Sequence, residues 1–107
     1  MVKYIIKDIE WSFISLSHEE YTKKYKKNGE ESAASAEVLK KTVFFDEEYL
    51  TKGIIAHELL HVYVYSCCIY SATNISGHDI EEICAEVIEY HLDDMVKARN
   101  FLWKNLK

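Results

Sequence analysis

The sequence predicts a single α+β domain, and three observations support this prediction. Runs rich in β-branched and aromatic residues occupy the first part of the chain, at 4–9, 11–16 and 36–45. Apolar residues recur at helical spacing in the second part, around 53–70 and 80–102. The length of 107 residues and a hydrophobic content of 49% suit one domain with one core. We therefore expect a small sheet of three or four strands packed on the first long helix.

The first elements are predicted as two strands followed by a short helix. Residues Tyr4–Ile9 and Trp11–Leu16 have strand composition and form either two strands or one long bent strand. Ser17 and Glu20 then make a capping-box pattern, with Ser17 as the N-cap and Glu20 three residues later. This pattern predicts a helix over about 18–27, which stops at Asn28 and Gly29.

A loop and a hairpin are predicted to follow. Residues 30–35 have loop composition, and Ala36–Leu39 and Thr42–Phe45 flank two lysines as the arms of a β-hairpin. Asp46–Glu48 has turn composition. The basic run Lys23–Lys27 falls at the end of the preceding helix, where cations oppose the helix dipole, so we favour a structural role for it over a binding patch.

Two helices are predicted for the rest of the chain. Thr51 is a suitable N-cap for a helix over about 52–68. Residues 71–78 have loop composition, and Ser76 or Asp79 begins a last helical region that continues to about 105. A break near 91–93 is compatible with the pattern, although no Gly or Pro forces one there.

Composition excludes several classes of function. The net charge is -5 and the middle of the chain is acidic, so no basic field for nucleic acid is expected. The N-terminus is too short and too charged for a signal peptide, and the polar motif in the middle of 53–72 argues against a membrane span. Cys67, Cys68 and Cys84 do not form a disulfide framework. A reduced, cytoplasmic protein without membrane or nucleic-acid partners is the expectation.

The most specific feature of the sequence is His57-Glu58-Leu59-Leu60-His61, which reads H-E-x-x-H. Two histidines four residues apart lie about 40° apart around a helix, so both imidazoles can reach one Zn²⁺. Glu58 follows one of them and can accept a proton from water. The apolar flanks leave little polar face, so we expect this helix to be buried. Burying two His and one Glu without partners costs several kcal/mol, which favours a metal site over two surface histidines.

The third ligand does not follow the metzincin pattern, H-E-x-x-H-x-x-G-x-x-H. Val64 stands where that pattern has glycine, and Cys67 stands where it has the third histidine. Without the glycine the helix does not turn back, and the Cys67 thiol would point along the helix away from the metal. Cys67 is therefore the less favoured candidate.

The favoured third ligand is Glu82, in the last helical region. Glu82 and Glu86 are four residues apart and share one face, so Glu82 can ligate the metal while Glu86 accepts a hydrogen bond from a ligating histidine. The competing interpretation is a solvated acidic face, which we expect for Glu81 and Glu89. Whether Glu81 or Glu86 is the ligand instead of Glu82 stays open.

The chain resembles the small phage and prophage zincin-like metallopeptidases of the ImmA/IrrE and minigluzincin groups. The resemblance covers most of the chain and depends on four stretches, which are the N-terminal strand ending in Lys7–Trp11, the strand Thr42–Phe45, the motif His57–Tyr63 and the sequence Glu81–Glu86. It implies one zincin-like metallopeptidase domain over residues 1–107. In gluzincins an E-x-x-x-D/E pattern supplies the third ligand and a supporting carboxylate, and Glu82 and Glu86 match it.

The resemblance also implies a function and a binding mode. The strand before the motif helix, Thr42–Asp46, would be the sheet edge along which an extended peptide pairs. The substrate would be a peptide or protein such as a repressor or a host protein, in a bacterial cytoplasm or a phage-infected host. The resemblance does not identify the substrate, and the sequence does not give the oligomeric state.

The predicted activity is zinc-dependent peptide hydrolysis of the gluzincin type. Zn²⁺ held by His57, His61 and Glu82 would activate water, and Glu58 would accept and return the proton. An oxyanion donor is not assigned; His78 is one candidate, and the others are Tyr63, Tyr65, Tyr70, Tyr90 and His91. The alternative is a catalytically idle zinc-stabilised domain that binds a protein partner. Glu58 favours catalysis, because a structural zinc site needs no carboxylate beside a water.

Overall fold

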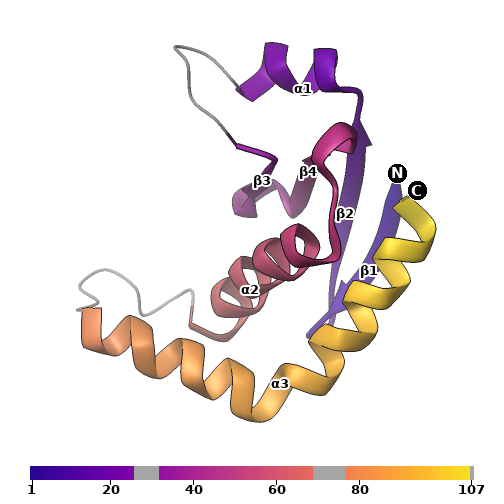
Figure 1. The fold of residues 1–107 in the computed structure, drawn as a ribbon. Coiled ribbons are helices and arrows are strands. Elements are labelled where there is room, and N and C mark those ends of the chain that lie inside the picture. Colours follow the sequence, from indigo (N-terminus) through magenta and orange to yellow (C-terminus); the bar gives the residue numbers. More distant parts are fainter. Residues whose placement is uncertain (26–31, 69–76, 107) are drawn as a thin grey trace.

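The computed structural model describes residues 1–25, 32–68 and 77–106, except for the side chains of 67–68 and 77–80. Its α+β architecture confirms the predicted class, with a four-stranded mixed sheet and long helices packed against it (Figure 1). The elements in chain order are β1 (Val2–Ile6), β2 (Ile9–Leu16), α1 (His18–Tyr25), β3 (Ala34–Glu37), the 3-10 helix η2 (Val38–Lys40), β4 (Thr42–Asp46), the 3-10 helix η3 (Glu47–Tyr49), α2 (Lys52–Cys68) and α3 (Gly77–Leu106).

The chain begins with a tight hairpin of β1 and β2. The strands are antiparallel with Ile6 opposite Ile9, so Lys7 and Asp8 form a two-residue turn. Their φ angles of 50° and 68° are the left-handed values that a type I′ hairpin turn requires. The two predicted strands are confirmed, but their limits are not, because the turn lies at 7–8 and not near residue 10. The turn was not predicted, because Lys-Asp is not the usual Asn-Gly or Asp-Gly sequence of a type I′ turn.

The strand order in the sheet is β1-β2-β4-β3. β2 and β4 pair in parallel, and β3 pairs antiparallel to β4, so the predicted hairpin is confirmed, with η2 at its tip. β3 begins at Ala34, within the stretch that was predicted to be a loop. The expectation that Thr42–Asp46 forms the sheet edge is wrong, because β4 has a partner on both sides. The edge on this side of the sheet is β3.

Helix α2 has the predicted limits and the predicted N-cap. The Ile54 N–H donates to Thr51 Oγ1 at 3.1 Å. One face of α2 carries Ile55, Leu59 and Val62, all fully buried in the core with β-strand residues such as Phe13. The opposite side carries His57 and His61, and both are exposed. The expectation that the whole helix is buried is therefore wrong, and the energetic cost that it assigned to two buried histidines does not apply.

Helix α3 is continuous, so no break occurs near 91–93. It starts at Gly77, which places Gly77 and His78 in the helix and not in the predicted loop, whereas 69–76 lie outside the described residues. The helix bends near its middle (Figure 1), packing along α2 and also against β1 and β2. Val87, Met95, Ala98 and Leu102 form its buried face. No described helix has a stretch long and apolar enough to cross a membrane.

Candidate metal centre

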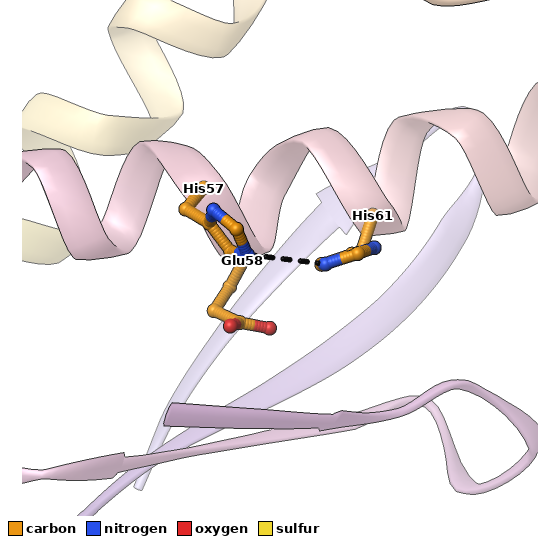
Figure 2. A group of neighbouring side chains, drawn as sticks. All are labelled: His57, Glu58 and His61. Carbon is orange, nitrogen blue, oxygen red and sulfur yellow. Dashed lines mark hydrogen bonds between the residues drawn. The ribbon is translucent and has the colours of Figure 1, made fainter. Parts of the chain in front are cut away.

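His57, Glu58 and His61 project from the same side of α2, as Figure 2 shows. The two Nε2 atoms lie 3.3 Å apart, and one ligand atom from each of the three side chains lies within 4.8 Å of the others. The rings meet edge to face, with centroids 5.0 Å apart. The sequence therefore places three potential ligand atoms together without help from any other element.

The helix periodicity explains this arrangement. Positions 57 and 61 differ by about 40° around the axis, and both lie across the helix from Ile55 and Leu59, which face the core. Glu58 lies between the two faces and is only 6% exposed. Packing of the apolar face thus fixes the rotation of α2, and this rotation turns the histidines to solvent and keeps the carboxylate at the boundary of the core.

The distance between the imidazoles fits one tetrahedral Zn²⁺. With Zn–N bonds of about 2.0–2.1 Å and a tetrahedral angle, two ligand nitrogens lie about 3.3–3.4 Å apart. The observed 3.3 Å between the Nε2 atoms agrees with this value. The same distance also allows a hydrogen bond between the rings when one of them carries its proton on Nε2. The pair is thus preorganised for a metal, and no backbone rearrangement is needed to bring the nitrogens together.

Glu58 has an environment suited to a base. Burial raises the pKa of its carboxyl above the ordinary value, and the nearby His61 and His57 oppose that shift. A carboxylate with a raised pKa binds a proton more strongly than a solvated one, which improves its ability to take a proton from water.

A cleft of about 510 Å³ opens beside His57 and Glu58. It lies between the start of α2 and the edge strand β3, and its lining residues are Ser32, Ala33, Ala34, Thr51, Gly53, Ile54, His57 and Glu58. Among these described residues only His57 and Glu58 are titratable. The residues that line the β3 side, Ser32, Ala33 and Ala34, all have small side chains.

Glu82 and Glu86 are not brought into this group. Both lie on α3 with exposed side chains, as does Glu81. Glu82 precedes the buried Val87 by five residues, which places the two about 140° apart around the helix. Glu82 is therefore not on the buried face of α3. Among the described residues, the group of ligand atoms within 4.8 Å of one another at the motif contains His57, Glu58 and His61 but not Glu82. Its role as third ligand stays a prediction.

The candidate oxyanion donors are dispersed. The side chain of His78, and all of Tyr70, lie outside the described residues, as does the Cys67 thiol. The Tyr65 hydroxyl accepts a hydrogen bond from Lys41 Nζ at 3.0 Å. The remaining candidates lie elsewhere: Tyr63 is buried with its ring 5.7 Å from that of His91, and Tyr90 is 70% exposed. No described tyrosine lines the cleft.

A second group of potential ligands was not predicted from the sequence. His18 Nδ1 lies 2.7 Å from Asp46 Oδ2 and 3.1 Å from Glu48 Oε2. His18 begins α1, whereas Asp46 ends β4, so the contact joins residues 28 apart in the sequence. Only the parallel pairing of β2 with β4 brings the two ends together. No spacing rule could have found this group.

Comparisons with known proteins do not place the chain in a family. A scan against models of protein families, a search of curated proteins and a search of solved structures each found no match.

Proposed function

We propose that this protein is a zincin-like, zinc-dependent peptide hydrolase of the gluzincin type. The observation that carries the proposal is the 3.3 Å separation of the His57 and His61 Nε2 atoms, beside the buried carboxylate of Glu58. Imidazole nitrogens are preferred zinc ligands, and the separation is that of two ligands on a tetrahedral ion. The substrate class would be a peptide or a protein segment in extended form.

The protein residues have distinct roles in this proposal. His57 and His61 hold the ion, which when bound supplies a Lewis acid and lowers the pKa of water. Glu58 takes the proton of the attacking water and returns it to the leaving amine of the cleaved peptide. The burial that raises the Glu58 pKa supports both transfers, because the group must bind the proton between them.

The proposal retains Glu82 as third ligand and Glu86 as its support. α2 and α3 pack against each other, and the first half of α3, which carries the acidic residues, runs beside the motif helix (Figure 1). Both carboxylates are exposed, so a side-chain rotation carries no cost from breaking a buried contact. His78, at the start of the same helix, stays the candidate oxyanion donor.

The alternative is a zinc-stabilised domain that binds a protein and cuts nothing. Exposed apolar residues on α3 favour it, since Ile88 and Leu92 are spaced by one turn and are 46% and 45% exposed. In that case Glu58 would serve no chemical purpose, and its burial would only cost stability.

The test combines metal analysis with peptide cleavage. Protein purified without chelator is expected to contain about one zinc per chain. Glu58→Gln should keep the zinc and lose cleavage of a denatured protein substrate by at least about 100-fold. The matched control is Glu89→Gln, which replaces an exposed carboxylate on α3 and should retain activity. Full cleavage activity in Glu58→Gln would refute the proposal. So would a wild-type protein that binds no zinc after it has been incubated with zinc.

A further inference from the structure

A second cleft continues the one beside the motif. Its volume is about 740 Å³, and its lining residues are His18, Thr22, Ser32, Ala33, Tyr49, Thr51 and Ile54. Ser32, Ala33, Thr51 and Ile54 line both clefts. The two are therefore compartments of one groove, which has Glu58 at one end and His18 at the other.

One wall of this groove leads into a free strand edge. No strand in the described part of the chain pairs with the second edge of β3. The Asp46 N–H donates to the Ala33 carbonyl, so the peptide groups of Ala33 point towards β4. Because peptide groups alternate along an antiparallel strand, those of Ala34 and Ala36 point to the free edge. Such an edge can hydrogen-bond the backbone of an extended peptide.

The His18 end of the groove adjoins an acidic cluster in a neighbouring cleft of about 540 Å³, and His18 lines both. Asp46 is fully buried, and its Oδ1 accepts the Glu48 N–H at 3.1 Å while its Oδ2 holds His18 Nδ1. Because both neighbours of Nδ1 are carboxylates, Nδ1 carries the proton and donates it. The ring of Tyr49 packs edge-on against His18, with centroids 5.6 Å apart. The imidazole is thus fixed on several sides.

The charge near the His18 end indicates which kind of chemical group would bind there. Glu47 and Glu48 are exposed and line the neighbouring cleft beyond His18, and neither is a lining residue of the groove itself. Two carboxylates, those of Asp46 and Glu48, contact the imidazole, and Glu47 lies between them in the chain. The cluster therefore keeps a net negative charge even with His18 protonated. The lysines of α1 do not neutralise it, because Lys23 pairs with Glu19 and Lys24 lies 4.6 Å from the Phe44 ring centre. Opposite charge favours a cationic group there.

We propose that the groove binds an extended peptide and that the acidic cleft beyond its His18 end selects a Lys or Arg side chain of that peptide. Glu48 and Glu47 would attract the cation, and the Asp46–His18 pair would hold Glu48 in place. This inference rests on the proposed function only in placing the cleaved bond at Glu58. It adds a specificity determinant, provided by η3, to the site on α2.

The test measures peptide binding to the full-length Glu58→Gln protein, which keeps the groove but does not cleave. The probes are fluorescein-labelled peptides of alternating Thr and Ala, about nine residues long, each with one Arg at a different position. A second set has Gln in place of Arg. Fluorescence anisotropy should show one position, or two neighbouring ones, where Arg binds about 3- to 5-fold more tightly than Gln. N-methylation of alternate amides of the best peptide should weaken binding to β3.

Variants separate the groove end from general charge. Glu48→Gln should remove most of the preference for Arg, whereas Glu10→Gln, at an exposed carboxylate on β2 that pairs with Lys3, should retain it. Raising the salt concentration should also reduce the preference. Equal binding of the Arg and Gln sets, or an unchanged preference in Glu48→Gln, would overturn the inference.

Failure of the specificity inference and failure of the proposed hydrolase function give different results. Cleavage by the wild-type protein without any preference for Arg would overturn the specificity inference alone. Preferential binding of the Arg peptide by a protein that holds no zinc would support the groove and refute the hydrolase.

Discussion

Replacement of His61 by alanine gives the most direct test of the metal centre. The structure predicts that His61→Ala changes the stability of the metal-free protein little, because His61 is exposed and its ring contacts the exposed His57. Exposed substitutions usually alter the free energy of unfolding by at most about 0.5 kcal/mol. The effect of the substitution should therefore appear only when zinc is present.

The size of the zinc effect follows from linkage. Free Zn²⁺ at about 100 times its Kd stabilises the folded state by about 2.7 kcal/mol when it binds only that state. For a chain of 107 residues, each kcal/mol raises Tm by about 4 °C, so wild-type Tm should rise by about 10 °C. With one of the two imidazoles removed, the rise in His61→Ala should fall to about 2 °C or less at the same zinc concentration.

The assay is thermal unfolding followed by circular dichroism, with and without zinc, supported by calorimetric titration. His18→Ala is the matched control, because His18 belongs to the other group of potential ligands. Relative to its own metal-free Tm, His18→Ala should keep the full rise. The reasoning is refuted if wild-type Tm does not respond to zinc, or if His61→Ala and the wild type respond equally.

Three further predictions concern the third ligand, the first turn and the core. Glu82→Ala should weaken zinc binding by about 10-fold or more in a calorimetric titration and Glu81→Ala should not, and the reverse result would identify Glu81 as the ligand. The double change Lys7→Asn with Asp8→Gly should raise the free energy of unfolding in urea by about 1 kcal/mol, because both positions have left-handed φ; a loss of stability would contradict the type I′ turn. Leu59→Ala removes a fully buried side chain and should lower the free energy of unfolding by about 2–4 kcal/mol, and a cost below about 1 kcal/mol would mean that α2 is not packed as described.

Local features of the fold could be predicted because their causes are local. Thr51 caps α2 through a hydrogen bond to a residue three positions away, and the limits of the helix follow from that cap and the apolar pattern. The hairpin of β3 and β4 likewise joins neighbours in the sequence. The turn at Lys7 and Asp8 is local too, but its residues lack the usual signal, so only the structure located it.

Some features of the candidate site could likewise be predicted from the sequence, and others could not. Helix periodicity alone brings His57 and His61 together, and the structure agrees with that geometry. The inference that the histidines are buried was wrong, because apolar flanking residues do not show which side of a helix its neighbours cover. The contact between His18 and Asp46 could not be predicted from the sequence, because it depends on the order of strands in the sheet.

The sequence by itself therefore determined the motif, its spacing and the helix that presents it. These depend on the fixed rise and rotation of an α-helix, which hold wherever the helix is placed. Only the tertiary structure decided that Glu58 is buried while its histidine neighbours face solvent, that β3 and not β4 is the open edge, and that an acidic cleft adjoins the His18 end of the groove. These properties arise from pairing and packing between residues distant in the chain, and no local rule of helix or strand geometry contains them.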